Sequence, residues 1–226
     1  MPAPSMPRLC TLLIDYGDFP SLVAATILSR PDEAVIFHPR GHDAGAAGRE
    51  AAAMRHGEVL DVGEFLVDGI PEIDAATVRD GSLADPQRVE ALDDACVLMR
   101  AAAAADRLGC SKILWPRQVG PDAERIGQAV QRANLVADVV QVGAGGTSTR
   151  RLVIDLPLVD LTDERLVDLA DDGGAPMRAF QPCSAKGGSI ATPCERCDGC
   201  RRWQAAFDAA GVAWPWMTVR GRADAA

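Results

Sequence analysis

The chain has 226 residues, of which 48% are hydrophobic and 24% charged, and its 23 basic and 32 acidic residues leave a net charge of −9. This composition excludes an intrinsically disordered chain and fits one large domain, or one domain with a small appendage. The negative charge disfavours bulk electrostatic binding to nucleic acid or an anionic membrane. Without a long apolar run or a secretory signal, we expect a cytoplasmic protein with no membrane partner.

The first half of the chain predicts alternating strands and helices. Three short apolar or strand-like segments are expected to form strands: 9–14, 34–37 and 58–62. Helices are expected at 21–28, where Pro20 suits the first turn, and at 44–55. Strands and helices that alternate at this pace require right-handed crossovers, so the pattern predicts an α/β fold with a mostly parallel sheet.

The second half continues this alternation after an irregular stretch at 63–85. Three further helices are expected: 89–108, 122–133 and 162–170. Three further strands are expected: 112–115, 139–142 and 152–155. In the longest helix, five apolar side chains are expected to face inward: Leu92, Val97, Leu98, Ala101 and Ala105.

Four cysteines near the C-terminus have the spacing of a metal site: Cys183, Cys194, Cys197 and Cys200. One turn of chain with two C-x-x-C steps can deliver three thiolates, and the preceding loop returns the fourth, which predicts a closed zinc knuckle. Basic residues nearby would stabilise the thiolates: Lys186, Arg196, Arg201 and Arg202. A redox pair and free thiols are the alternatives, whereas catalytic zinc is disfavoured because four sulfurs leave no open position.

The remaining cysteines, histidines and tryptophans have structural interpretations. Three cysteines in apolar patterns are expected to be small core residues: Cys10, Cys96 and Cys110. Three histidines without recognisable partners are expected at the surface or at helix caps: His38, His42 and His56. Three tryptophans that follow the cysteine array are expected to pack in the core or a lid: Trp203, Trp214 and Trp216.

The cysteine array and its flanks resemble the C-terminal third of the 7-cyano-7-deazaguanine synthase family. The flanking segments are Leu156-Pro157-Leu158, Leu161-Thr162, Ala206-Phe207 and Gly211-Val212. Other matching features occur in the same order: the first strand, loop and helix, then Phe37 followed by Arg40, His42 and Glu50, then the alanine-rich helix ending at Leu108-Gly109. The resemblance covers residues 9–212.

This resemblance implies an ATP-using ligase of the PP-loop pyrophosphatase group. The implied fold is a doubly wound, adenine nucleotide alpha hydrolase-like sheet at 9–175, with a zinc-binding subdomain at 176–216 and tails at 1–8 and 217–226. The family reaction adenylates 7-carboxy-7-deazaguanine and converts it with ammonia to the nitrile, within queuosine biosynthesis. Family members use ATP with Mg²⁺, carry structural zinc and are usually homodimers.

The loop after the first strand departs from the family sequence Ser-Gly-Gly-x-Asp-Ser. It reads Asp15-Tyr16-Gly17-Asp18-Phe19-Pro20-Ser21, where Gly17 and Ser21 remain as the remnant nucleotide-binding residues. Tyr16 is too bulky for close backbone approach, Pro20 removes an N–H donor, and the aspartates add charge at an anion site. Three other family segments have changed similarly: Asp93-Asp94 for Arg-Asn, Asp163 for a lysine after Thr162, and Pro121-Asp122 for Tyr-Pro-Asp-Cys-Arg.

The sequence therefore predicts a zinc-containing homologue with a degenerate nucleotide site, whose use of ATP is lost or altered. It would bind a deazapurine-like small molecule or a protein partner, and we assign no catalytic residue. The alternatives are an active ligase of the same family and a different enzyme acting on a neutral heterocycle. A nucleic-acid module built on the zinc knuckle is disfavoured by the acidic charge.

Overall fold

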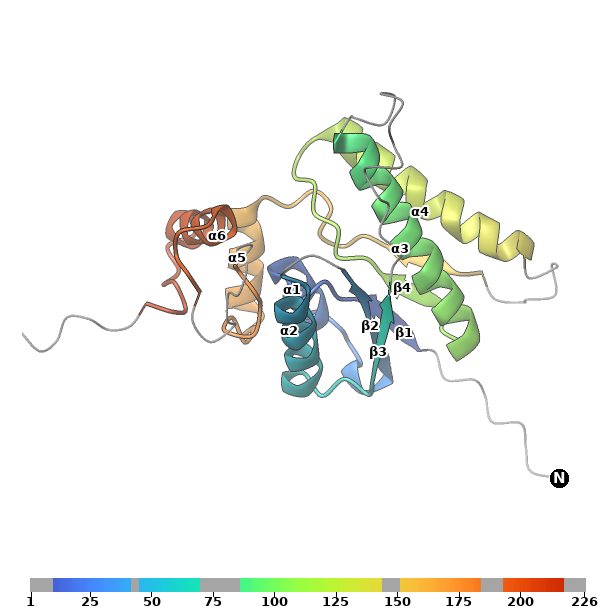
Figure 1. The fold of residues 1–226 in the computed structure, drawn as a ribbon, viewed down its shortest axis with the longest axis horizontal. Helices are drawn as coiled ribbons and strands as arrows, with labels where there is room; N and C mark the ends of the chain where they lie inside the picture. The colour runs from blue at the N-terminus through green and yellow to red at the C-terminus, as the bar shows by residue number, and fades with distance from the viewer. Residues whose placement is uncertain (1–9, 42–44, 70–85, 144–150, 184–192, 218–226) are drawn as a thin grey trace, which may run out of the picture.

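The computed structural model describes residues 10–41, 45–69, 86–143, 151–183 and 193–217 (Figure 1). The strands are β1 (Thr11–Ile14), β2 (Ala34–Arg40), β3 (Glu64–Gly69), β4 (Lys112–Leu114) and β5 (Val153–Asp155). The helices are α1 (Phe19–Thr26), α2 (Ala46–Val59), α3 (Pro86–Leu108), α4 (Ala123–Gly143), α5 (Asp163–Asp172) and α6 (Asp198–Ala209), with a 3₁₀ turn at Pro31–Glu33.

The strands form one parallel sheet with the order β3-β2-β1-β4-β5. β1 lies at its centre, where Leu12 is opposite Val35 of β2 on one side and Ile113 of β4 on the other. The strand order reverses between β1 and β4, and ligands of open α/β sheets bind outside the carboxyl ends of the strands at such a switch point. The predicted doubly wound α/β fold is confirmed. A ligand is expected in the crevice between the segments that follow β1 and β4.

Helices cover both faces of the sheet, with α1 and α2 on one side and α3 and α4 on the other (Figure 1). On the first side, Leu13 and Ile36 pack in a core with residues of α1, α5 and α6. On the second side, Leu12 and Phe37 pack in a core that includes Leu98 of α3. Neighbouring residues of a strand point to opposite faces, so two covered faces bury nearly all residues of β1 and β2.

The C-terminal segment packs on α1 through an aromatic cluster. The ring centroid of Phe19 lies 4.7 Å from that of Phe180, 4.8 Å from Trp203 and 5.5 Å from Phe207. Two further tryptophans extend the cluster: Trp214 and Trp216. The rings are tilted or edge-on, which is the favourable arrangement for aromatic pairs. The tryptophans therefore pack as predicted.

Two helices are longer than the sequence predicts. Helix α2 continues to Val59 and β3 begins only at Glu64, so the predicted strand at 58–62 is wrong. The irregular stretch at 63–85 contains β3, and its residues 70–85 lie outside the described part. Helix α4 continues to Gly143, so the predicted strand at 139–142 is wrong. Valine favours strands locally, but Val140 packs against the core below α4, and such tertiary packing overrides propensity.

Several side chains differ from the expected positions. Leu92 is 41% exposed, whereas the other four apolar residues expected to face inward from α3 are buried. Cys10 and Cys110 are joined by a disulfide at the amino ends of β1 and β4 instead of being separate core residues, and Cys96 is free and half-buried. Among the helices of the described segments, none combines the length and the apolar character needed to cross a membrane.

Candidate functional site

The four predicted metal ligands come together beside α6, and we call them the cysteine site: Cys183, Cys194, Cys197 and Cys200. Their sulfur atoms all lie within 4.8 Å of one another. The Sγ atoms of Cys194 and Cys200 are 3.9 Å apart, and those of Cys183 and Cys197 are 3.8 Å apart. Four thiols at these separations can hold a metal ion.

Backbone N–H groups orient the cysteine site. Cys197 is the N-cap of α6, and its sulfur accepts a hydrogen bond from the N–H of Cys200 at 3.5 Å. The sulfur of Cys194 accepts from the N–H of Cys197 at 3.4 Å, across a turn in which Glu195 has a φ of +56°. Hydrogen bonds from the backbone of Arg196 and Cys197 lower the pKa of the Cys194 thiol, whereas burial raises the pKa of Cys200. The Cys194 thiolate is thus stabilised by the local fold.

In the segment from residue 15 to residue 21, called the β1 loop below, three backbone N–H groups donate to side chains of the same segment. Asp15 Oδ1 accepts from the N–H of Gly17 at 2.7 Å, and Ser21 Oγ accepts from the N–H of Tyr16 at 2.9 Å. Asp18, the N-cap of α1, accepts from the N–H of Ser21 at 3.0 Å and from its hydroxyl at 2.6 Å. Such groups bind phosphate when they are free at a helix start. Here aspartate and serine oxygens already accept hydrogen bonds from the N–H groups of Tyr16, Gly17 and Ser21.

Neighbouring segments enclose the β1 loop. Gly17 has a φ of +72°, and a Cβ atom at this position would lie 2.0 Å from the carbonyl oxygen of Arg49 in α2. The carbonyl oxygen of Gly17 accepts from the N–H of Gln181 at 3.0 Å. Burial raises the pKa of Asp18, and hydrogen bonds from Ser21 offset this only in part. Gly17 therefore permits a close backbone contact, and a role of Gly17 and Ser21 in nucleotide binding stays a prediction.

Two histidines are buried below the β1 loop, so their predicted surface or capping positions are wrong. His56 Nδ1 donates to Asp15 Oδ2 at 2.8 Å, and His38 Nδ1 donates to the backbone carbonyl oxygen of Asp15 at 2.7 Å. Both partners are acceptors, which places the proton on Nδ1 in each ring. Burial lowers the pKa of His38 and keeps its ring neutral. The third histidine, His42, lies outside the described residues.

An aromatic pair spans the crevice between β1 and β4. The indole N–H of Trp115, directly after β4, donates to the hydroxyl oxygen of Tyr16 at 3.1 Å. Trp115 is completely buried, and burial raises the pKa of Tyr16, so the phenol stays neutral. Tyr16 therefore extends toward β4, across the position where a ligand of the crevice would lie.

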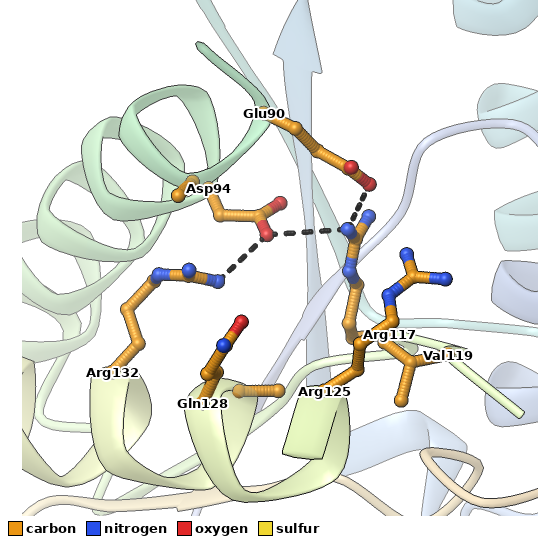
Figure 2. A pocket seen from close by; sticks show the side chains of 9 residues that line it. Glu90, Asp94, Arg117, Val119, Arg125, Gln128 and Arg132 are labelled. Atoms are coloured by element: carbon orange, nitrogen blue, oxygen red, sulfur yellow. Dashed lines mark hydrogen bonds and ion pairs between the residues drawn. The ribbon is translucent and has the colours of Figure 1, made fainter. Parts of the chain in front are cut away.

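A polar pocket, called the arginine pocket below, lies beyond Tyr16 between α3, α4 and the segment after β4 (Figure 2). Arg117 forms ion pairs with Glu90 and, at 3.4 Å, with Asp94. Arg132 of α4 forms an ion pair with Asp94 at 3.0 Å. Burial raises the pKa of Asp94 to about 6, and the two arginines oppose this increase. Asp94 is thus not an isolated negative charge in the crevice.

Asp163, at the position where the resemblance expects a lysine, also has a cationic partner. Asp163, at the start of α5, accepts from Arg202 of α6 at 2.6 and 2.7 Å and from Gln118 at 3.0 Å. Burial disfavours the Asp163 carboxylate, but the hydrogen bonds from Arg202 and Gln118 outweigh it and lower the pKa. This cluster joins α6, α5 and the segment after β4 at one side of the crevice.

Sequence reasoning missed several residues of this crevice. Arg117, Gln118 and Arg132 belong to no motif and were not predicted as site residues. Their only sequence signal is that Arg117 and Gln118 follow a predicted strand, where ligand-binding loops of parallel sheets lie. Arg40, the last residue of β2, and Glu50 of α2, both of which belong to the family resemblance, form an ion pair at 2.7 Å with each other.

Comparison with known families matches the second half of the chain. Residues 95–211 match the model of the family described as "Queuosine biosynthesis protein QueC". The matched segment is more than half of the 226 residues and includes all four cysteines, Arg117 and Asp163. No curated protein sequence matches the chain significantly.

Solved structures with similar folds have low sequence identity to this chain. The U34-tRNA thiolase NcsA from Methanococcus maripaludis, with its [4Fe-4S] cluster, has a TM-score of 0.49 and 15% identity over 81% of this chain and 62% of its own. The chain therefore spans less than two thirds of the thiolase. The NH3-dependent NAD synthetase from Campylobacter jejuni subsp. jejuni NCTC 11168 has a TM-score of 0.48 and 12% identity over 78% of this chain and 71% of its own. NMN synthetase from Francisella tularensis has a TM-score of 0.47 and 16% identity over 92% of this chain and 79% of its own.

Proposed function

The chain belongs to the queuosine biosynthesis protein QueC family, and from this membership we propose a zinc-containing member that binds a deazapurine-like small molecule and has lost the family's use of ATP. The proposal has two parts, a zinc ion in the cysteine site and a β1 loop that does not accept a triphosphate. The first part concerns stability and the second concerns the reaction, so each can be tested alone.

Zinc fits the cysteine site better than the other groups that cysteines form. Four thiolates at ~2.3 Å from a tetrahedral Zn²⁺ lie about 3.8 Å apart; two of the sulfur separations here are 3.8 and 3.9 Å, and none exceeds 4.8 Å. A disulfide needs about 2.0 Å, and a four-iron cluster, which carries its thiolates on separate irons, spreads them further. Four sulfur ligands leave no open position for water, so the ion would supply structure and not catalysis.

One observation carries the second part, namely the internal hydrogen bonding of the β1 loop. The N–H groups of Tyr16, Gly17 and Ser21 all donate to side chains of the loop itself. A bound triphosphate would have to displace Asp15 and Asp18, or lie beside them. Each carboxylate would then cost about 4 kcal/mol at 4–5 Å from a phosphate charge in an effective dielectric of about 20.

Titration calorimetry and a product assay test this proposal on the zinc-loaded full chain. We expect no heat of binding with millimolar Mg·ATP and no AMP release with 7-carboxy-7-deazaguanine and ammonia, while 7-carboxy-7-deazaguanine alone binds. Tight binding of Mg·ATP together with AMP release would overturn the proposal. The Asp18→Ser variant is a useful comparison, because serine keeps a side-chain cap for α1 and removes one negative charge.

The active ligase of the family is the second candidate, and one observation favours it. The resemblance expects a lysine after Thr162, where this chain has Asp163, but Arg202 reaches the same place from α6. A cation is therefore still present at this side of the crevice. In this alternative the protein would make 7-cyano-7-deazaguanine with ATP and ammonia, and the AMP assay above decides between the two candidates.

A further inference from the structure

The disulfide between Cys10 and Cys110 lies at the amino-terminal edge of the sheet, opposite the crevice. Cys10 directly precedes β1, and Cys110 lies two residues before β4. The amino ends of parallel strands meet at one edge of a sheet, whereas ligands of such folds bind at the other edge. The disulfide therefore belongs to none of the cysteine site, the β1 loop and the arginine pocket, and the proposed function does not explain it.

The two cysteines of this disulfide differ in exposure. Cys110 is only 6% exposed and belongs to the core that includes Leu98 of α3, whereas Cys10 is half-buried. Cys10 also lines a cavity of about 350 Å³ along the amino ends of β1, β2 and β3. Small-molecule sites begin at volumes of roughly 300 Å³. A small molecule in this cavity would thus approach the disulfide from the side of Cys10.

The lining of this cavity is acidic. Asp32, Glu33 and Glu64 contribute to it, and none of the described lining residues is basic. Arg30 forms an ion pair with Glu33 at 2.9 Å, which offsets one of the three charges. A disulfide is attacked by a thiolate, so nearby carboxylates slow a thiol with a further negative charge and favour one with a positive charge.

We propose that Cys10 is a thiol–disulfide exchange site for small cationic thiols. The thiolate of such a molecule attacks the Sγ atom of Cys10, the bond to Cys110 breaks, and Cys110 leaves as a thiolate that takes up a proton. The small thiol stays on Cys10 as a mixed disulfide. In the reverse step Cys110, whose Cα atom lies 4.6 Å from that of Cys10, attacks the Cys10 sulfur and releases the small thiol. Each step exchanges one disulfide for another, so it needs no oxidant.

Exchange with two thiols of opposite charge tests this inference on the zinc-loaded full chain. The probes are cysteamine, a cation, and 2-mercaptoethanesulfonate, an anion. Each rate is divided by the rate of the same thiol with hydroxyethyl disulfide, which removes the intrinsic difference between the probes. Alkylation and peptide mass spectrometry should locate the mixed disulfide at Cys10. We expect cysteamine to react about fivefold faster at low salt, and the two rates to converge in about 1 M salt.

Two variants test the role of the acidic lining. The double variant Asp32→Asn, Glu64→Gln removes two exposed carboxylates and should reduce the preference for cysteamine to less than about twofold. The matched control is Asp208→Asn, which changes an exposed carboxylate of α6 and should keep the full preference.

A third variant tests the reverse step. Cys110→Ser, loaded at Cys10 with cystamine, should keep the adduct after free thiol is removed, whereas the wild type should release it and re-form the disulfide.

Several results would overturn the inference. They are adducts at Cys110 or at the cysteine site in place of Cys10, equal normalised rates for the two probes, equal preferences in the double variant and its control, and equal release from Cys110→Ser and the wild type. Free thiols at both positions of the air-oxidised chain would also overturn it. None of these results depends on binding of Mg·ATP, so the proposed function can fail while the exchange site remains.

Discussion

The cysteine site and the β1 loop both adjoin one aromatic cluster, through Trp203 of α6 and through Phe19, and the sequence resemblance expects them to differ from the family pattern to different degrees. All four cysteines are kept, and their sulfurs lie within 4.8 Å of one another. By the sequence resemblance, the β1 loop retains Gly17 and Ser21 as remnant nucleotide-binding residues, and several of its other side chains have structural roles. Phe19 is completely buried among the rings of Phe180, Trp203 and Phe207.

The proposed function accounts for this difference, because a structural site and a ligand site tolerate change unequally. Losing one cysteine ligand would leave a metal with an incomplete shell and would destabilise the fold. Changing the loop after a strand leaves the fold intact, provided that its N–H groups still find acceptors. Asp15 and Asp18 are such acceptors, so the aspartates that would repel a phosphate are the residues that complete the loop.

The largest expected effect follows from removing one cysteine ligand. Cys197→Ser should lower the free energy of unfolding by at least about 3 kcal/mol, because metal binding contributes directly to folding. For a chain of this length, the corresponding fall in melting temperature is about 6–12 °C. Thermal unfolding followed by circular dichroism, with zinc content measured by elemental analysis, checks both values.

The matched control for Cys197→Ser is Cys96→Ser, which changes a free, half-buried thiol of α3 outside the cysteine site. Its melting temperature should change little, and its zinc content should stay at one ion per chain. If the two variants unfold at the same temperature, the cysteine site contributes nothing to stability and the contrast with the β1 loop disappears.

An intermediate effect is expected from a pair of glycine substitutions that measures how tightly the β1 loop is enclosed. Gly17 and Gly120 have φ angles of +72° and +75°, but only a Cβ at Gly17 would clash, at 2.0 Å from the Arg49 carbonyl oxygen. Gly120→Ala should cost about 1 kcal/mol for the left-handed backbone alone. Gly17→Ala should cost at least about 3 kcal/mol, because the backbone of α2 must also move.

Urea denaturation of both glycine variants measures these two costs under the same conditions. Equal destabilisation would mean that α2 does not press on Gly17, and the loop would then have room to open for a ligand. A much larger loss for Gly17→Ala would support the closed loop on which the proposed function depends.

Most of the fold was predictable because it depends on local patterns. Short apolar runs predicted β1 and β2, and Thr162 at the start of α5 marks that helix by capping the N–H of Arg165. The strand predicted at 58–62 failed because Val59 and Leu60 look like a strand locally, while the edge strand itself has only a three-residue apolar run between Glu64 and Asp68. Edge strands carry a weaker apolar signal than buried ones.

The charge of the crevice was harder to predict, because ion pairs join residues distant in the sequence. The Asp93-Asp94 pair and Asp163 each look like the loss of a family cation when the sequence is read alone. In the structure, Arg132 contacts Asp94 from 38 residues away, and Arg202 contacts Asp163 from 39 residues away. No local motif connects such pairs. The cysteine site was predictable since three of its four ligands lie within one turn of chain.

The smallest expected effect tests how far these distant arginines neutralise the crevice. The pKa of Asp94 is about 6, above its ordinary value of 3.8, so the folded protein binds this proton more tightly than the unfolded chain. The stability that this proton provides is present below pH 4 and is lost as the pH rises through 6.

Asp94→Asn resembles the protonated form at every pH. Its excess in free energy of unfolding over the wild type should grow by about 1.4 kcal/mol between pH 5 and pH 7.5. Urea denaturation at both pH values measures this difference, with Asp106→Asn as an exposed control on α3. Lower stability of Asp94→Asn at pH 7.5 would show that the ion pairs with Arg117 and Arg132 outweigh burial. The aspartate would then belong to a fully compensated network, and the acidic replacements would leave the electrostatics of the crevice close to those of the family.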